Sequence, residues 1–202
     1  MIKKLRIPTP TPNPSSVDDD DKSYALAVLD SGKLLVGGYA YNGATDDFAL
    51  ARYDSDGTLD TTFGSGGKTT TDFGYDDVIW TMNVLESGKI LVGGYAYNGI
   101  ANFAMARYNS DGTLDTTFGS GGKTTTDFGY GTDKVFAVTV RGDGKLVVAG
   151  YAYADTDYDF ALAMYRADGS VGPGPALVTR AVFGPPGVPH TRGTFRRRVF
   201  WR

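Results

Sequence analysis

The sequence predicts an all-β protein built from three copies of one small antiparallel sheet. A unit of 56 residues recurs along the 202-residue chain, so that Gly32, Gly88 and Gly144 are evenly spaced. Within each copy apolar and polar residues alternate, and glycine-containing turns interrupt the pattern about every 8 to 12 residues. Alternation with a period of two is typical of β-strands, because successive side chains point to opposite faces of a sheet.

The copies are nearly identical in places. Residues 52–75 match residues 107–130 at 23 of 24 positions, and the single difference is Asp54 against Asn109. Such identity indicates recent duplication or homogenisation. Recurrence in several copies therefore does not by itself mark a residue as functional.

Each copy divides into four predicted strands, which in the first copy cover residues 24–29, 33–41, 48–53 and 68–73. The turn between the first two strands contains Gly32, and glycine accepts the positive φ that tight hairpins need. The fourth strand is rich in β-branched threonine. Gly37 and Gly38 are unusual inside a strand, and they predict a bulge or a close approach of neighbouring backbone.

A four-stranded unit of this size cannot bury both of its faces alone, so the copies are expected to pack face to face around an axis. This arrangement is a β-propeller, and we expect blades at residues 20–75, 76–130 and, incomplete, 131–171. Closed propellers typically have about 4 to 8 blades. The chain is therefore predicted to be a partial propeller, whose apolar end faces favour a homo-oligomer that completes the ring.

The two ends of the chain differ from the repeats. Residues 1–19 are a proline-rich linker, and no apolar segment follows Lys3 and Lys4 to make a signal peptide. Residues 18–22 match a protease tag site, but they also align with the blade boundary at Asp76 and Asp77, which we prefer as the interpretation. Residues 172–202 lack the repeat motif and are expected to be disordered or read out of frame.

Three motifs stand out in the repeats: Asp-Gly-Lys-Leu-Val-Val-Ala-Gly-Tyr at 143–151, Phe-Ala-Leu-Ala-Arg-Tyr at 48–53 and Asp-Gly-Thr-Leu-Asp-Thr-Thr-Phe-Gly at 56–64. Together these motifs resemble the bacterial delta-60 repeat. The resemblance covers about residues 20–170. It implies propeller blades in a mainly secreted or cell-surface protein. That family has no settled biochemical activity, so the resemblance transfers no catalytic residues.

Composition excludes several functional classes. The chain has no cysteine, and its only histidine is His190, so disulfide frameworks, cysteine-ligated metals, Ser-His-Asp triads and multi-histidine sites are excluded. The net charge is −3, and all 23 acidic residues lie before residue 171. An acidic body repels phosphate backbones, so we expect no nucleic-acid partner. No apolar run approaches the roughly 18 residues of a membrane span.

An acidic turn is the strongest metal-site candidate, because closely spaced carboxylates and a glycine are typical of Ca²⁺ loops. The alternative is a plain turn, in which aspartate side chains bond to nearby backbone N–H groups. The third copy has Arg166 in the corresponding turn, which would repel a cation. The predicted calcium ligands are Asp54, Asp56, Asp60, Asn109, Asp111 and Asp115.

Tyrosines recur at alternate positions of the second strand, so they should share one face of each sheet. On that face they would stack on sugar rings in a repeated shallow pocket. The alternative is packing between blades, where aromatic rings fill the wedge. The six predicted ligand-binding residues are Tyr39, Tyr41, Tyr95, Tyr97, Tyr151 and Tyr153.

Two further pairs of residues have structural predictions. Arg52 and Arg107 are expected to pair with Asp72, Asp127 or the blade-boundary acids Asp21, Asp77 and Asp133. The alternative is that these arginines contact a ligand. The phenylalanines that precede the glycine-rich loops, Phe63 and Phe118, are expected to seal those loops against the blades. The loops themselves lack the spacing of a phosphate-binding loop.

These features predict a non-enzymatic binding or structural module of a bacterial surface or secreted protein, which recognises a glycan or a protein. The alternative is a propeller-type hydrolase or lyase that uses loop carboxylates. Loops that repeat without specialising, and blades without histidine, argue against that alternative.

Overall fold

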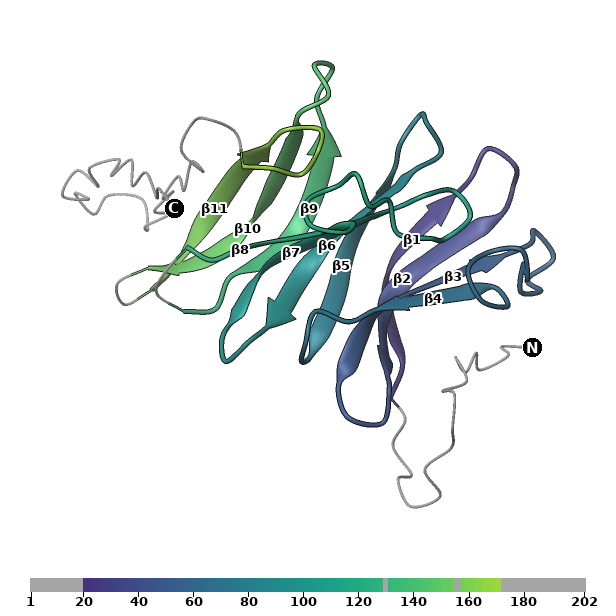
Figure 1. Ribbon diagram of the computed structural model, residues 1–202, viewed down its shortest axis with the longest axis horizontal. Helices are drawn as coiled ribbons and strands as arrows, with labels where there is room; N and C mark the ends of the chain where they lie inside the picture. Colours follow the sequence, from purple (N-terminus) through teal and green to yellow (C-terminus); the bar gives the residue numbers. More distant parts are fainter. Residues whose placement is uncertain (1–19, 129–130, 155–156, 172–202) are drawn as a thin grey trace, which may run out of the picture.

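The computed structural model describes residues 20–128, 131–154 and 157–171, so the predictions for residues 1–19 and 172–202 lie outside the described residues. Every regular element within these ranges is a strand, and the strands form three antiparallel sheets that follow one another along the long axis (Figure 1). The predicted all-β class is confirmed. No helix in the described part of the chain is long and apolar enough to cross a membrane.

Each sheet follows the chain order of its strands. The first contains β1 (Lys22–Val28), β2 (Leu34–Tyr41), β3 (Asp46–Tyr53) and β4 (Lys68–Thr71). The second contains β5 (Asp77–Val84), β6 (Ile90–Tyr97), β7 (Ala101–Tyr108) and β8 (Lys123–Thr126). The third, within the described residues, contains β9 (Lys134–Val140), β10 (Leu146–Ala154) and β11 (Asp157–Tyr165).

A β-bulge interrupts the first hairpin of every sheet. The pairing register omits Tyr24 in β1, Trp80 in β5 and Phe136 in β9. At the same place the two backbones approach closely, since a Cβ atom on Gly38 would lie 1.8 Å from the carbonyl oxygen of Lys22. The bulge and close approach predicted from the paired glycines are confirmed.

The sheets pack face to face, as the repeat pattern predicts. Strand β5 contacts β1, β2 and β3 of the first sheet, and β9 contacts β5, β6 and β7 of the second. One apolar core lies between the first two sheets and joins Phe48 and Leu50 to Ile79. A second core joins Phe103 of the second sheet to Val135 of the third. The first strand of each blade is thus the element that meets the preceding blade.

The same hydrogen bonds recur at both joints between blades. A tyrosine hydroxyl of each later sheet donates to a threonine of the sheet before it, and a glycine N–H of each earlier sheet donates to a carbonyl of the sheet after it. The loop phenylalanines Phe63 and Phe118 are fully buried, which confirms their predicted role. The bonds are Tyr108 Oη to Thr71 Oγ1 (2.8 Å), Tyr165 Oη to Thr126 Oγ1 (2.7 Å), Gly64 N to Asp111 O (2.6 Å) and Gly119 N to Asp168 O (2.7 Å).

Candidate ligand-binding site

The acidic turns contain a buried carboxylate that is already held by two cationic side chains. Lys33 Nζ donates to Asp60 Oδ2 at 2.7 Å, and Arg52 Nε donates to the same oxygen at 2.6 Å. The other oxygen accepts the N–H and hydroxyl of Thr62. The hydrogen bond from Lys33 is the main cause that holds the pKa of Asp60 well below its usual range. Asp115 repeats this arrangement in the second blade.

Arg52 uses its remaining donors to join the first blade to the second. Its Nη1 donates to the carbonyl of Ser110 at 2.5 Å, and its guanidinium lies 4.7 Å from the centre of the Phe63 ring. Arg107 makes the same contacts one repeat later. The partners predicted for these arginines were wrong: the structure pairs them with Asp60 and Asp115, eight residues further along the chain.

The other predicted calcium ligands also take part in turn hydrogen bonds. Asp54 Oδ1 accepts a bond from Lys33 Nζ at 2.8 Å, and Asn109 donates to a threonine hydroxyl four residues later. Asp56 and Asp111 each accept the N–H and hydroxyl of the threonine two residues later. The calcium interpretation stays a prediction, and the cationic partners of the two buried carboxylates count against it.

The six predicted tyrosines divide into two groups. The second strand of each sheet carries two of these tyrosines, and the later one lies toward the loop that follows the strand. Tyr97, for example, is 41% exposed and contacts Tyr75 edge to face. The earlier ones lie beside the bulges of the first strands, where Tyr39 is only 8% exposed. The first group is Tyr41, Tyr97 and Tyr153, and the second is Tyr39, Tyr95 and Tyr151.

The bulges bring three aromatic residues together, and we call Tyr24, Trp80 and Phe136 the aromatic ladder. The ring centres of Tyr24 and Trp80 lie 4.2 Å apart, and those of Trp80 and Phe136 lie 5.8 Å apart. Tyr24 is 43% exposed and Phe136 is 47% exposed. Tyr39 and Tyr151 contact the two ends of the ladder, at 6.2 and 5.5 Å between ring centres. The sequence showed the aromatic position in each repeat, but not that the rings meet.

Charged groups lie close to Tyr95, one of the tyrosines beside the bulges. The ammonium of Lys134 lies 4.1 Å from the centre of the Tyr95 ring. Burial, together with the nearby carboxylates of Asp46 and Asp76, raises the pKa of Tyr95 to about 12. The N–H of Asp46 donates to Asp76 Oδ1 at 3.2 Å, which fixes the two acids next to each other. One cationic and two acidic side chains therefore lie close to Tyr95.

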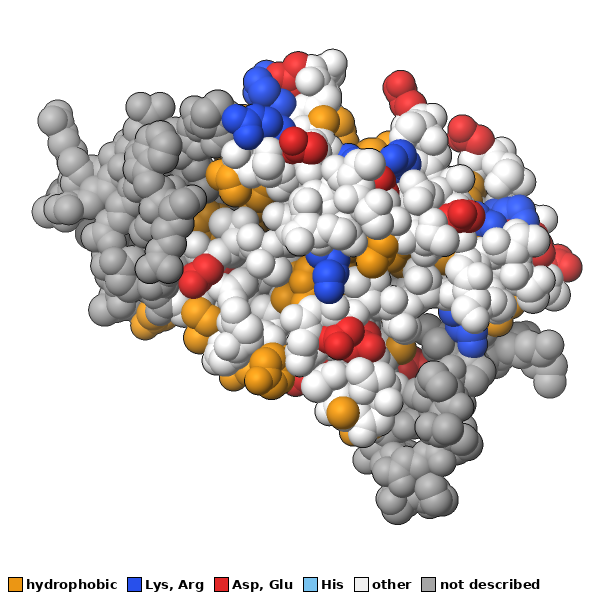
Figure 2. Space-filling view, viewed as in Figure 1, with side chains coloured by type: hydrophobic (Ala, Val, Ile, Leu, Met, Phe, Trp, Pro, Cys, Tyr) orange, Lys and Arg blue, Asp and Glu red, His pale blue; other side chains and the backbone are white. Residues whose placement is uncertain are grey.

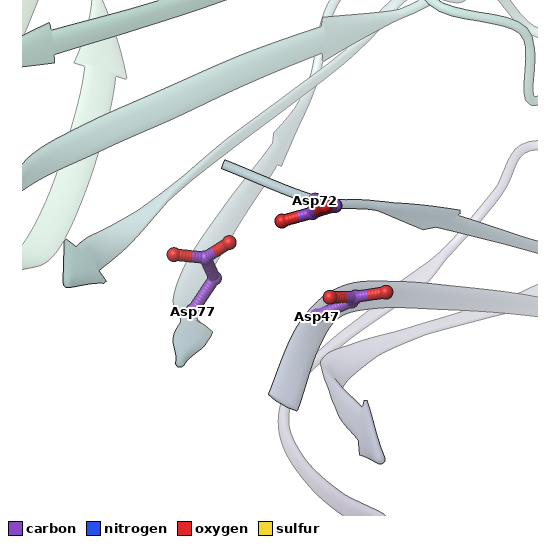
Figure 3. Close-up of side chains that lie close together, drawn as sticks. All are labelled: Asp47, Asp72 and Asp77. Atoms are coloured by element: carbon purple, nitrogen blue, oxygen red, sulfur yellow. The ribbon is translucent and has the colours of Figure 1, made fainter. Parts of the chain in front are cut away.

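A carboxylate cluster that the sequence analysis missed lies between the first two blades. Asp47, Asp72 and Asp77 come from three different elements, and one oxygen of each lies within 4.8 Å of the others (Figure 3). Asp77 is fully buried, and its Oδ2 accepts the N–H of Phe73 at 2.6 Å. Burial raises the pKa of Asp77 to about 7. Such a cluster either shares protons or holds a cation, and only the folded chain brings its members together.

A groove of about 590 Å³ lies next to the first hairpin turns of the first and second sheets. Its lining includes Val28, Glu86, Lys33 and Arg52. The two cationic groups already bind Asp60, so the groove offers an incoming anion little free positive charge. The aromatic ladder is therefore the better candidate for a binding surface.

Comparison with known families supports the repeat architecture. Residues 30–63, 86–118 and 141–173 each match the family model described as a domain of unknown function (DUF5122) beta-propeller. No curated protein matches the chain. Each matched segment begins near the first hairpin turn of a repeat and covers its second and third strands. The chain thus carries three repeats that are similar to this beta-propeller domain of unknown function.

Proposed function

We propose that the protein is a non-catalytic binding module that holds a glycan or a protein segment at the aromatic ladder. The observation that carries this proposal is the repeated bulge. In all three blades the bulge takes an aromatic residue out of strand pairing, and two contacts join these residues between neighbouring blades, Tyr24 with Trp80 and Trp80 with Phe136. Bulges commonly re-aim a side chain in this way near functional sites.

The surroundings of the ladder favour a glycan over a protein segment. The C–H faces of a sugar ring are apolar and pack on aromatic rings, while its hydroxyls need donors and acceptors close by. The exposed rings of Tyr24 and Phe136 would pack on the sugar ring. The charged groups near Tyr95, which are Asp46, Asp76 and Lys134, would bond to its hydroxyls. Because the chain resembles bacterial delta-60 repeats, the proposal includes a secreted or cell-surface location. Glycans are abundant at such locations.

Catalysis by loop carboxylates is the alternative, and the ionisation of these groups argues against it. A general acid needs a pKa near the working pH. Hydrogen bonds from lysine, threonine and arginine side chains hold the pKa of Asp60 and Asp115 far below that range. Asp77, with a pKa of about 7, would suit the chemistry, but its side chain is fully buried and its Oδ2 accepts the N–H of Phe73.

Intrinsic fluorescence can test the proposal, because Trp80 belongs to the ladder and Trp201 is the only other tryptophan. In a Trp201→Phe background, we expect a bound glycan to change the emission of Trp80. A glycan array would supply the candidate ligands. Replacing Tyr24 by Ser should weaken binding about tenfold, which corresponds to roughly 1.4 kcal/mol of lost ring contact. Tyr75→Leu, at an exposed aromatic residue outside the ladder, should leave binding unchanged.

Three outcomes would contradict the proposal or its details. Binding that Tyr24→Ser leaves intact would place the ligand elsewhere. Selective binding to a peptide array, with no glycan bound, would favour the protein ligand. Release of reducing sugars from a bound glycan would favour the hydrolase, and elimination products would favour the lyase.

A further inference from the structure

We propose that the carboxylate cluster between the first two blades, Asp47, Asp72 and Asp77, is a Ca²⁺ site that ties these blades together. Each member comes from a different segment. Asp47 lies in β3, Asp72 follows β4, and Asp77 begins β5 of the second blade. An ion bound to all three would therefore join the two sheets. The proposal concerns the ion alone and does not depend on the ligand of the aromatic ladder.

Strand pairing places the first two carboxylates side by side. Phe48 of β3 pairs with Thr71 of β4 in the antiparallel register, so Asp47 and Asp72 are the next residues along the two strands. Asp77 reaches them because its Oδ2 accepts a main-chain N–H of the turn between β4 and β5. Figure 3 shows the carboxylates of Asp77 and Asp72 directed toward each other, with an oxygen of Asp47 beside the same space.

One oxygen of Asp77 lacks the hydrogen bond that its equivalents accept. The side chain is fully buried, and its Oδ1 has no hydrogen-bond partner. At the same position of the first and third blades, Asp21 Oδ1 and Asp133 Oδ1 accept a tyrosine N–H at 3.3 and 3.2 Å. In the second blade the corresponding N–H, that of Tyr97, donates to the carbonyl of Asp76 at 3.1 Å. A buried carboxylate oxygen without a partner is costly, and a cation beside it would remove that cost.

The negative charge of the cluster is not neutralised by the chain. Among the described residues, no lysine or arginine forms a salt bridge with the three carboxylates. Asn42 Nδ2 donates to both oxygens of Asp47, at 3.0 and 3.1 Å, and the N–H of Gly74 donates to Asp72 Oδ1. Lys123 Nζ donates at 2.8 Å to the main-chain carbonyl of Asp72 and not to its carboxylate. These bonds hold the carboxylates in place and leave lone pairs for an ion.

The spacing of the oxygens suits Ca²⁺ better than Mg²⁺. One oxygen of each carboxylate lies within 4.8 Å of the others. Two ligands of one ion are separated by at most twice the bond length, which is about 5 Å for Ca²⁺ and about 4 Å for Mg²⁺. Ca²⁺ also takes about six to eight oxygen ligands, so water would complete its shell. Water can reach Asp72, which is exposed, and acidic side chains form a surface patch near the junction of the first two sheets (Figure 2).

The joint between the second and third blades has a less negative version of the same arrangement. Asn102 replaces Asp47 there, whereas Asp127 and Asp133 are acids like their equivalents. The amide oxygen of Asn102 is buried without a hydrogen-bond partner, but it carries no charge. Because the charge of the ligands tunes Ca²⁺ affinity, we assign the ion to the first joint and use the second joint as an internal control.

Isothermal titration calorimetry with calcium chloride tests the proposal directly. Protein freed of ions with EDTA is the starting point, and a pH of 8 keeps Asp77, whose pKa is about 7, mostly ionised. We expect one ion per chain with a Kd of about 1 mM or less, and weaker binding of Mg²⁺. Ca²⁺ should also raise the melting temperature, because an ion that binds only the folded state stabilises it.

Two charge-matched variants identify the site. Asp72→Asn and Asp127→Asn each remove one negative charge from an exposed residue at the same position of the repeat. The first should weaken Ca²⁺ binding about tenfold or more, and the second should leave the Kd close to that of the parent chain. Asp56→Ala, in the acidic turn of the first blade, should also leave it unchanged. Circular dichroism would show that each variant is folded.

Several results would overturn the proposal. A parent chain that binds no Ca²⁺ at millimolar concentration would show that the carboxylates share protons instead. Unchanged binding in Asp72→Asn would place the ion elsewhere, and a loss in Asp56→Ala alone would place it in the acidic turn. Equal losses in Asp72→Asn and Asp127→Asn would show that the ion responds to the overall charge of the chain and not to this cluster.

Discussion

At the scale of single residues, Asp77 and Asp133 are equivalent acids with unequal surroundings. Each closes the loop before the first strand of its blade by accepting a phenylalanine N–H, at 2.6 and 2.9 Å. Asp133 also accepts the N–H of Tyr153 at 3.2 Å, whereas Asp77 Oδ1 is buried without a hydrogen-bond partner. Burial raises the pKa of Asp77 to about 7 and that of Asp133 to about 6.

We expect Asp77 to make folding stability fall as the pH rises from about 4 to about 7. The folded state keeps its proton in this window while the unfolded state has lost it, so each pKa unit of difference costs about 1.4 kcal/mol. Asp77→Asn removes this titration, and its amide oxygen can still accept the N–H of Phe73. Urea unfolding from pH 4 to 8 should show that the variant gains stability relative to the parent as the pH rises.

Asp133→Asn is the matched comparison. An amide can accept only one of the two backbone N–H groups at this position, so the variant should be destabilised at pH 4. Because the pKa of Asp133 is itself raised to about 6, this deficit should become smaller as the pH rises from about 4 to about 6. If the difference between the parent and Asp77→Asn were independent of pH, Asp77 would ionise like an exposed acid and the prediction would be wrong.

At the scale of elements, the bulged hairpin fixes both the sheet and the ladder. Gly94 lies where β5 and β6 approach, and a Cβ atom there would lie 1.8 Å from the carbonyl oxygen of Val78. Backbone on both sides cannot move aside as a flexible side chain can. The glycine pairs are therefore needed for the geometry that takes Trp80 out of strand pairing.

Gly94→Ala should lower the free energy of unfolding by about 3 kcal/mol or more, since backbone strands must separate to admit the methyl group. Chemical unfolding followed by circular dichroism measures this loss. Gly142→Ala is the control, because a Cβ atom there would have no atom within 4 Å. Equal stability of the two variants would refute the close approach.

At the scale of the whole molecule, the described fold ends at the turn after β11. Val171 pairs with Tyr165 through an isolated bridge, and a Cβ atom on Gly169 would lie 2.6 Å from the Phe118 ring of the second blade. Residues that precede position 172 therefore already join the third blade to the second blade.

Deletion of residues 172–202 should leave the melting temperature of the rest of the chain unchanged within a few degrees. Differential scanning calorimetry of the full and shortened chains makes the comparison. A large decrease would show that the deleted residues supply a strand beside β11, and the repeat would then be more complete than its sequence indicates.

The sequence alone determined the features that depend on neighbouring residues. Strand periodicity, turn glycines and the 56-residue repeat predicted three antiparallel sheets, with strand ends correct to within about two residues. The bulge at Gly37 and Gly38 was also predictable, because glycine inside a strand typically marks a bulge or a close approach of backbone. The burial of Phe63 and Phe118 followed from their place before glycine-rich loops.

Only the tertiary structure decided which distant groups meet. Arg52 pairs with Asp60 because the turn after β3 folds back on its strand, which the spacing of acids along the chain does not reveal. The ladder and the Asp47, Asp72 and Asp77 cluster depend on how one blade lies against the next. Periodicity fixes the face on which a side chain lies, whereas contacts between blades depend on the angle and offset of their packing, which no local pattern encodes.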